Sequence, residues 1–457
     1  MPIPRVIIAG LAGGTGKTTV SLGVTRALTK QGLCVQPFKK GLDYADAAWL
    51  GLAAGRFSAS LDLFMLDRDA LAAHFCQWAG GAGIAIIEGN RGFFDGRDLA
   101  GSCSTADVAV ALAAPVVLVV DCTKMTRTAA ALVAGCASFP GGERIAGVIL
   151  NNTANSRHRS ITRRAVEDLA GVPVLGVLPR FETLPFMECS SGLSSAGEAE
   201  EAVLAFCESI ALEYVDLAMV RRIACSAGPV AYCAISPRAV TATPGKAHIG
   251  IVRDAAFWQY YEENLAALRD AGAVLHTVSL LDDVPWPHLD GLYIGGGDMA
   301  PHMERLAANA AKLDAVREGV RSGMPVYAEQ AGFVCLMESF SLHGAVYPLA
   351  GIFPVRAVAC KKPQGLGYVE ASGATLPFFA SGMPIRGHEY HYIRLLEEEH
   401  LPWLLRRTIG AHLGRVWDGL AAQHCWGAFM QIFAPAAPDW APMFVAAAKA
   451  YRDMHVV

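Results

Sequence analysis

The chain has 457 residues, of which 53% are hydrophobic and 18% are charged, and its formal net charge is −4. This length suffices for two or three domains with large buried cores, and the composition disfavours intrinsic disorder. A nucleic-acid partner requires a clustered positive surface, and the sequence has no long basic run, so we expect no nucleic-acid partner.

The cysteines and the apolar segments bear on the compartment. Twelve cysteines are scattered without a Cys-x-x-Cys pair or zinc-type spacing, which indicates free thiols in a reducing environment. The first residues do not have the pattern of a signal peptide. The longest apolar stretch, residues 108–120, contains Pro115 and is too short to span a bilayer. We therefore expect a cytoplasmic protein without a membrane partner.

Short runs of Val, Ile and Leu alternate with helical segments through the first half of the chain. Such runs are typical of strands buried on both faces of a parallel sheet. Their alternation with helices predicts an α/β domain with right-handed crossovers. The predicted strands are residues 6–9, 84–87, 116–120, 147–150 and 174–177, and the first predicted helix spans residues 18–29.

A glycine-rich segment, Ala-Gly-Leu-Ala-Gly-Gly-Thr-Gly-Lys-Thr-Thr at residues 9–19, joins the first predicted strand to the first predicted helix. Glycines let the backbone turn its N–H groups toward phosphate oxygens, and the helix N-terminus adds positive potential. The strict Gly-x4-Gly-Lys spacing fails because Leu11 stands at the first glycine position. We still predict a phosphate loop, in which Lys17 reaches the terminal phosphates of ATP and Thr18 ligates Mg²⁺. The predicted nucleotide-binding residues of the loop are Gly13, Gly14, Thr15, Gly16, Lys17, Thr18 and Thr19.

Acidic residues for a Mg-ATP site lie near the ends of the early strands. Asp43 and Asp46 lie in Lys-Lys-Gly-Leu-Asp-Tyr-Ala-Asp, Glu88 follows the strand at 84–87, and Asp95 comes seven residues later. The carboxyl ends of parallel strands share an edge with the phosphate loop, so we expect Glu88 beside the nucleotide. Each acid alone could be a solvated loop charge, whereas the set indicates a catalytic site.

A stretch rich in Ser, Thr, Pro and Ala at residues 226–246 indicates a linker. We therefore expect an ATP-binding domain at 1–225, the linker at 226–246 and a second domain at 247–457. The strand–helix alternation resumes in the second domain. Its predicted strands are 248–252, 274–278, 291–294 and 325–328, and its first predicted helix spans 258–271.

These segments together resemble the cobyrinate a,c-diamide synthase family (CobB/CbiA), in order and over nearly the whole chain. The resemblance implies an α/β fold: an N-terminal, dethiobiotin-synthetase-like P-loop domain with a parallel sheet, and a C-terminal class I glutaminase-like α/β domain. The matching segments beyond the loop include residues 37–44, 60–66, 88–96, 104–106, 146–151, 176–180, 252–257, 366–368 and 386–392.

Enzymes of this family use ATP to convert a carboxylate into an acyl phosphate, which ammonia then converts into an amide. Mg²⁺ and lysine neutralise the charge on the transferring phosphoryl group. The resemblance implies ATP and Mg²⁺ as cofactors and a homodimer as the assembly. It further implies site roles for particular residues: catalysis by Lys17, Asp46 and Asp95, metal ligation by Thr18, Asp43 and Glu88, and an adenine contact by Asn151.

The glutaminase-like domain departs from the family at two positions. Gln330 stands where the family has its cysteine nucleophile, and Gln431 stands where it has its catalytic histidine. A carboxamide can act neither as nucleophile nor as general base. We therefore predict that the domain does not hydrolyse glutamine and that ammonia is free or supplied externally. Under a further hypothesis, Cys335 or Cys425 replaces the missing nucleophile.

The resemblance implies a tetrapyrrole substrate with acetate side chains. The sequence Glu-Gly-Asn-Arg-Gly at 88–92 resembles siroheme-amidating relatives of the DsrN type, so we predict a siroheme-type substrate. A family stretch with an Arg-His pair is replaced at 184–193, which also argues against an ordinary corrinoid enzyme. Cobyrinate and nickel-sirohydrochlorin a,c-diamide synthesis are the alternatives. A tetrapyrrole carrier with a nucleotide switch is the rival of another class. The polar cluster of Arg386, His388, Glu389 and His391 has either a core or interface role or a tetrapyrrole-contacting role.

Overall fold

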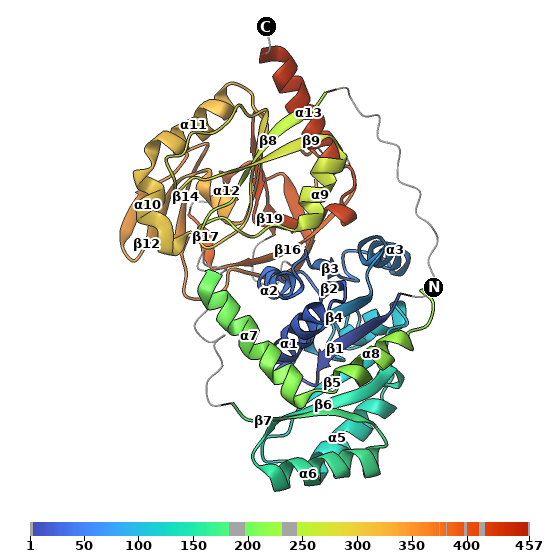
Figure 1. Ribbon diagram of the computed structural model, residues 1–457. Coiled ribbons are helices and arrows are strands. Elements are labelled where there is room, and N and C mark those ends of the chain that lie inside the picture. Colours follow the sequence, from blue (N-terminus) through green and yellow to red (C-terminus); the bar gives the residue numbers. More distant parts are fainter. Residues whose placement is uncertain are drawn as a thin grey trace. The chain divides into compact units, whose positions relative to one another are not determined.

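The computed structural model describes residues 3–181, 197–230, 245–373, 375–380, 382–396, 400–410 and 416–455. These residues fold into two compact units, one formed by the described residues up to 230 and the other by those from 245 onward. Figure 1 shows the first unit in blue to green and the second in yellow to red. The expected linker at 226–246 falls mostly on residues 231–244, which lie outside the described ranges.

The first unit is built on a seven-stranded parallel sheet with the order β3-β2-β4-β1-β5-β6-β7. Ile7 in the central strand pairs with Ile87 on one side and Val116 on the other, so apolar side chains fill both faces. All five predicted strands are confirmed. The strands are β1 (Arg5–Gly10), β2 (Val35–Lys40), β3 (Ala59–Leu61), β4 (Ile84–Gly92), β5 (Val116–Asp121), β6 (Ile145–Thr153) and β7 (Val174–Pro179).

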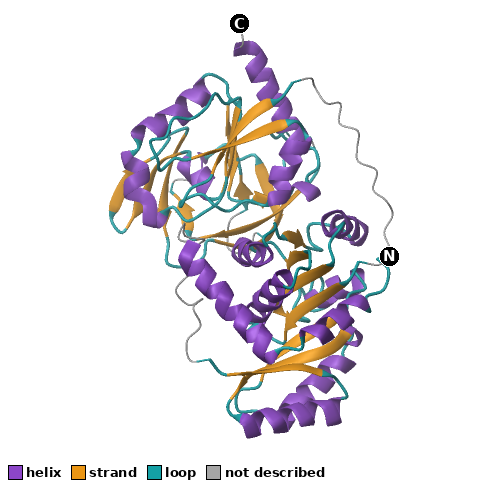
Figure 2. Cartoon of the chain, viewed as in Figure 1, coloured by secondary structure: helices purple, strands orange, loops and turns teal. Residues whose placement is uncertain are grey.

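Helices pack on both faces of this sheet, as Figure 2 shows. Several begin with a polar side chain that accepts a hydrogen bond from a backbone N–H of the first turn; Asp43, Asp67 and Ser104 are examples. The helices are α1 (Lys17–Lys30), α2 (Tyr44–Ala54), α3 (Arg68–Ala79), α4 (Thr105–Ala111), α5 (Arg127–Ser138), α6 (Ser156–Ala165), α7 (Gly197–Tyr214) and α8 (Leu217–Cys225).

The second unit contains a six-stranded sheet with the order β20-β21-β11-β10-β8-β9, in which β20 alone is antiparallel to its neighbour. The predicted helix at 258–271 begins late, because Trp258 and Gln259 donate their backbone N–H groups to the carbonyl of Gly296. The strands are β8 (Ala247–Val252), β9 (Ala273–Val278), β10 (Gly291–Ile294), β11 (Val326–Glu329), β20 (Leu420–Ala422) and β21 (Cys425–Ala428). The helices are α9 (Glu262–Asp270), α10 (Met303–Ala308), α11 (Ala310–Arg321), α12 (Ala331–Cys335) and α13 (Trp440–His455).

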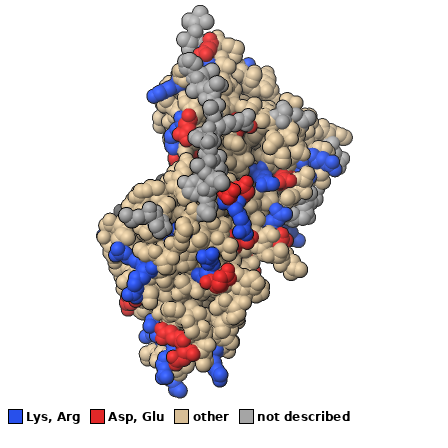
Figure 3. Space-filling view, turned by 90° about the vertical axis from the view of Figure 1, so that its right-hand side faces the viewer, with Lys and Arg blue, Asp and Glu red and all other residues tan. Residues whose placement is uncertain are grey.

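Two smaller sheets complete the second unit, with the orders β13-β12-β14-β17 and β19-β18-β15-β16-β22. Their strands are β12 (Met337–Leu342), β13 (Ala345–Pro348), β14 (Phe353–Ala359), β15 (Gly365–Ser372), β16 (Ile385–His391), β17 (Ile393–Leu395), β18 (Leu405–Ile409), β19 (Trp417–Asp418) and β22 (Gln431–Ile432). No helix in the described ranges is long and apolar enough to cross a bilayer. On the face shown in Figure 3, side chains of both charge signs are interspersed.

Candidate functional sites

The loop between β1 and α1 has the geometry of a phosphate-binding loop. Gly13 and Gly14 are exposed, and Gly16 has a φ of +91° directly before the helix begins. A Cβ atom at Gly16 would lie 2.3 Å from Nδ2 of Asn151, so only glycine fits there. The N-terminal end of the 14-residue helix α1 adds positive potential to the exposed backbone. The loop is therefore suited to binding an anion.

Asn151, the predicted adenine contact, braces this loop. Its Nδ2 donates a hydrogen bond to the backbone oxygen of Thr15 at 2.9 Å, and the residue is buried. Asn151 lies near the carboxyl end of strand β6, on the same side of the sheet as the carboxyl end of β1, although β5 lies between the two strands. The side-chain amide fixes the loop conformation, while an adenine contact by Asn151 stays a prediction.

A buried carboxylate lies at the start of α1. The hydroxyl of Thr18 donates to Oε1 of Glu88 at 2.7 Å, and the Glu88 side chain is fully buried. Burial raises the pKa of Glu88 to about 7, against the opposing effect of the Lys39 and Lys17 charges. Oε2 of Glu88 has no hydrogen-bond partner within the described ranges. A hydroxyl beside a carboxylate with an unused oxygen fits the oxygen-ligand chemistry of Mg²⁺.

Lys39 is a site residue that the sequence analysis did not assign. Its Nζ lies 3.2 Å from Oε1 of Glu88 and 2.5 Å from Oδ2 of Asp46, and the side chain is fully buried. Burial alone would lower the pKa of Lys39, but the two carboxylates raise it above its ordinary value. No signal for this role was available in the sequence, because the strand that carries Lys39 was not predicted; the burial of Lys39 makes the role visible, since a buried ammonium requires a paired acid.

The remaining predicted acids lie at the same edge of the sheet in less enclosed positions. Asp43 caps α2, since its Oδ1 accepts from the backbone N–H of Asp46 at 3.1 Å. Asp95 is exposed, and its Oδ2 accepts from the backbone N–H of Gly92 at 3.2 Å. The structure thus joins Asp46 to Glu88 through Lys39. The metal role of Asp43 and the catalytic roles of Asp46, Asp95 and Lys17 stay predictions, as does nucleotide binding by the buried Thr19.

The second unit contains a sharp strand-to-helix turn at the predicted nucleophile position. Gln330 lies between β11 and α12 with φ +49° and ψ −109°, a conformation uncommon for any residue but glycine. Such backbone strain costs about 1–3 kcal/mol and is usual where a turn presents a functional side chain. The strained turn is thus present at the predicted nucleophile position, with a carboxamide as its side chain.

Within the described residues, the side chain of Gln330 makes three hydrogen bonds. Oε1 accepts from the backbone N–H of Gly297 at 2.9 Å and from that of Ala331 at 3.4 Å. Nε2 donates to the backbone oxygen of Tyr390 at 2.7 Å. Gln431 lies close by, because a Cβ atom at Gly296 would be 2.4 Å from both Oε1 of Gln330 and Nε2 of Gln431. The structure thus brings the two predicted degenerate positions together.

The two cysteines considered as replacement nucleophiles are both fully buried, Cys335 in α12 and Cys425 in β21. Burial raises the pKa of the Cys335 thiol to about 12, and burial also raises the pKa of the Cys425 thiol. The thiolate is the nucleophilic form of cysteine. Both thiols are therefore in environments that disfavour the reactive form.

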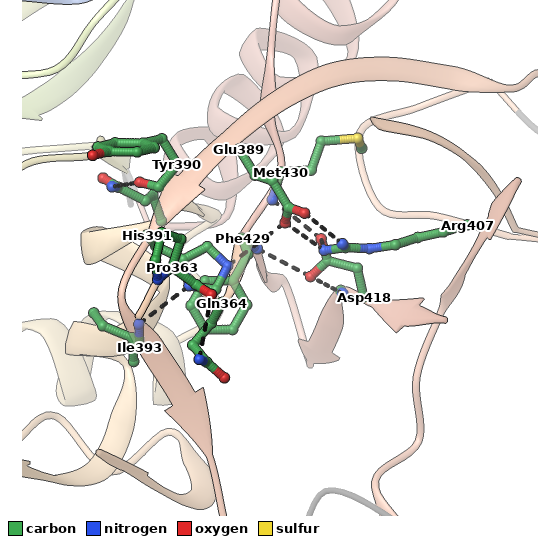
Figure 4. A network of polar contacts seen from close by, with 12 residues as sticks. Pro363, Gln364, Glu389, Tyr390, His391, Ile393, Arg407, Asp418, Phe429 and Met430 are labelled. Atoms are coloured by element: carbon green, nitrogen blue, oxygen red, sulfur yellow. Dashed lines mark hydrogen bonds and ion pairs between the residues drawn. The ribbon is translucent and has the colours of Figure 1, made fainter. Parts of the chain in front are cut away.

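A charged network in the second unit joins Arg407, Glu389 and Asp418 (Figure 4). Arg407 donates to both carboxylate oxygens of Glu389 at 2.7 Å and to Asp418 at 2.9 Å, and all three side chains are almost completely buried. Asp418 in turn accepts from the backbone N–H groups of Phe429 and Met430, at 3.0 and 3.1 Å. The network therefore fixes the segment that leads to Gln431.

The polar cluster at 386–391 is divided by the strand it lies on. Glu389 and His391 are buried, and the His391 ring stacks on Phe429 with a centroid distance of 4.0 Å. Arg386 instead forms an ion pair with Glu370 at 2.9 Å on the exposed side. No group of three or more His, Cys, Asp or Glu side chains that could hold a metal ion occurs in the part of the chain that the structure describes. The replaced stretch at 184–193 lies outside the described residues.

Comparisons with known proteins match both units. Residues 6–191 match the CobQ/CobB/MinD/ParA nucleotide binding domain, and residues 248–435 match the CobB/CobQ-like glutamine amidotransferase domain. A cobyrinate a,c-diamide synthase from Magnetococcus marinus is 40% identical over 96% of each chain, and one from Picrophilus torridus is 33% identical over 97% of this chain and 99% of its own. The solved structure of PurLQS from Thermotoga maritima matches 46% of this chain and 100% of its own at 15% identity, with a TM-score of 0.34. The identity to these two synthases over nearly the whole chain shows that this chain belongs to the cobyrinate a,c-diamide synthase (CobB/CbiA) family.

Proposed function

We propose that the protein is an ATP- and Mg²⁺-dependent ligase that amidates a side-chain carboxylate of a tetrapyrrole. The observation that carries its nucleotide-dependent part is the contact of Thr18 with the buried Glu88 at the start of α1, next to a glycine-rich loop. The names of the sequence relatives support the tetrapyrrole class of the substrate. A carboxylate is a poor electrophile, and its conversion to an acyl phosphate supplies a leaving group that ammonia can displace.

The residues of the first unit divide this task. The loop N–H groups and Lys17 bind the phosphates, and Thr18, Glu88 and Asp43 are the proposed ligands of Mg²⁺, which neutralises charge on the transferring phosphoryl group. Lys39 keeps Glu88 in place and offsets its charge, since its Nζ lies 3.2 Å from that carboxylate. We assign Asp46 and Asp95 to the orientation of the substrate carboxylate and of ammonia.

The comparisons favour a cobyrinate-type substrate over the siroheme-type substrate that we predicted first. The two relatives reported above are both named cobyrinate a,c-diamide synthase. The siroheme prediction depends on one short segment around Asn90 and Arg91. Arg91 is exposed at the end of β4 with a φ of +49°, so its guanidinium is available to a substrate carboxylate. Siroheme therefore stays the second candidate.

The second unit supports a proposal for the nitrogen source. With glutamine side chains at 330 and 431, the chain supplies neither a thiolate nor an imidazole at these two positions. We propose that ammonia comes from solution or from another protein. Glutaminase activity through Cys335 or Cys425 is the competing hypothesis, and it predicts glutamate release that is lost in the Cys335→Ala or Cys425→Ala variant.

A mass-spectrometric assay with cobyrinate, sirohydrochlorin and siroheme tests the proposal. With Mg-ATP and ammonium, we expect one substrate to lose about one mass unit for each carboxylate converted to an amide, with one ADP formed per amide. A purified protein that binds the pigment but leaves its mass unchanged under all these conditions would be a carrier, and the ligase proposal would then be wrong.

A further inference from the structure

The ends of strands β2 and β4 bring together two cations that the proposed reaction centre does not use. They are Lys40, the last residue of β2, and Arg91, near the end of β4. We propose that Lys40 and Arg91 together bind one carboxylate of the substrate, other than the carboxylate that is amidated. This inference rests on the proposed function, because it assigns a further binding site for the same substrate.

Lys40 has different surroundings from its neighbour Lys39. Successive side chains of a strand point to opposite faces of the sheet, so Lys40 points away from the ion pair between Lys39 and Glu88. Lys40 is only 5% exposed, and its ammonium makes no hydrogen bond within the described residues. A buried ammonium without a hydrogen-bonded acid is costly, and a bound anion would reduce that cost.

Arg91 lies near Lys40 because the ends of the two strands are packed together. A Cβ atom at Gly41 would lie 3.0 Å from Nδ2 of Asn90 and 3.9 Å from Oδ2 of Asp62. The residue after Lys40 therefore lies against the residue before Arg91. The two cations are thus placed at neighbouring points of one sheet edge, beside a single carboxylate.

The charges around Lys40 indicate a site for an anion. Burial lowers the pKa of Lys40, the charges of Lys39 and Arg91 lower it further, and the Asp62 carboxylate does not offset these effects. Burial also raises the pKa of the neighbouring Cys103 thiol, so this group adds no negative charge at neutral pH. A carboxylate of the substrate would supply the negative charge that the cluster lacks.

Arg91 makes the site accessible from solvent. Its side chain is exposed, whereas the backbone N–H and carbonyl of the preceding Asn90 are both bonded to the hydroxyl of Thr105, at 3.2 and 3.3 Å. A fixed backbone thus carries an exposed guanidinium. We expect the carboxylate to bind at the surface beside Arg91, while Lys40 attracts it from below through its charge. A tetrapyrrole with several acetate side chains can present this second carboxylate.

Three variants of the full chain change one cation each. Arg91→Met removes a charge at an exposed position, where the fold should be kept, and Arg91→Lys retains the charge. Lys40→Met keeps a side chain of similar length without the ammonium. Arg164→Met is the matched control, because it removes a cation from α6 whose side chain is 78% exposed.

Equilibrium dialysis with cobyrinate, and in parallel with siroheme, tests the proposal in the absence of ATP. We expect Arg91→Met and Lys40→Met each to weaken binding of at least one pigment roughly tenfold, and Arg91→Lys and Arg164→Met to weaken it about twofold or less. The fully methyl-esterified pigment should bind the wild type and the variants equally, because it has no carboxylate. If either folded Met variant binds both pigments as tightly as the wild type, or if the wild type binds neither, the proposal is wrong.

Steady-state kinetics separate this binding role from a role in the reaction itself. In the ammonium-dependent assay, the two Met variants should raise the KM for the pigment and leave kcat and the KM for ATP near the wild-type values. A wild type that binds the pigment through these cations but forms no amide would refute the proposed function and leave the binding result intact.

Discussion

Replacing Arg407 with methionine should destabilise the second unit strongly. The guanidinium makes three charge-assisted hydrogen bonds, two to Glu389 and one to Asp418, and the three side chains are at most 2% exposed. Methionine fills similar volume but leaves both carboxylates buried without their cation. Removing one partner of a buried ion pair costs about 3–5 kcal/mol, and here two acids lose the same partner, so we expect the upper part of that range.

The assay is denaturant unfolding of the second unit, with tryptophan fluorescence as the probe. Arg406 neighbours Arg407 on β18 but is exposed, so Arg406→Met is the matched control, with an expected change of about 0.5 kcal/mol or less. Adding Glu389→Gln and Asp418→Asn to Arg407→Met should recover part of the loss, because the buried charges are then gone. An Arg407→Met protein as stable as the Arg406→Met control would refute this reasoning.

The other predictions concern the nucleotide site and the buried acid before the turn. Glu88→Gln should lower ATP-dependent amidation about a hundredfold or more, because it removes the charge proposed to hold Mg²⁺; ADP release measures this, and full activity would contradict the assignment. Lys39→Met should lower the free energy of unfolding of the first unit by about 3 kcal/mol, since Glu88 then loses its buried partner, whereas Lys30→Met on the surface should change it little. Burial raises the pKa of Glu329 to about 7 from an ordinary 4.5, so its contribution to stability is complete below pH 4.5 and is lost as the pH rises through 7. Relative to Glu329→Gln, the wild type should therefore lose about 3 kcal/mol of unfolding free energy across that window; urea unfolding at several pH values measures it, and a constant difference would show that the acid does not titrate there.

The fold was predictable wherever apolar runs coincide with strands buried on both faces. The run at residues 116–120 is such a case, and it lies in β5, inside the parallel sheet. Strand β2 was not predicted because Gln36, Lys39 and Lys40 interrupt its apolar pattern, although all three are buried. The small sheets of the second unit were also not predicted. Their longer strands lack a continuous apolar run: β14 and β16 alternate buried with less buried residues, which is a weaker signal.

In the candidate sites, local motifs were predictable from the sequence, whereas contacts between segments distant in the chain were not. The phosphate loop and the position of Glu88 follow from local motifs and the rule that parallel strands end at one edge. The pairing of Lys39 with Glu88 depends on the register between β2 and β4, which a single sequence does not specify. The hydrogen bonds of Gln330 depend on segments 33 and 60 residues away in the chain. The glutamine at position 330 was visible in the sequence, whereas the hydrogen-bond partners of its side chain were not.

The central claim is that a working nucleotide site is combined with a second unit that does not hydrolyse glutamine. The most direct test is isotope incorporation. The purified protein is incubated with Mg-ATP, the tetrapyrrole substrate, ¹⁵N-ammonium and unlabelled glutamine. The product amide is then analysed by mass spectrometry. The account predicts that the new amide nitrogen is ¹⁵N and that glutamine is not consumed. Unlabelled amide formed with the release of glutamate would contradict it.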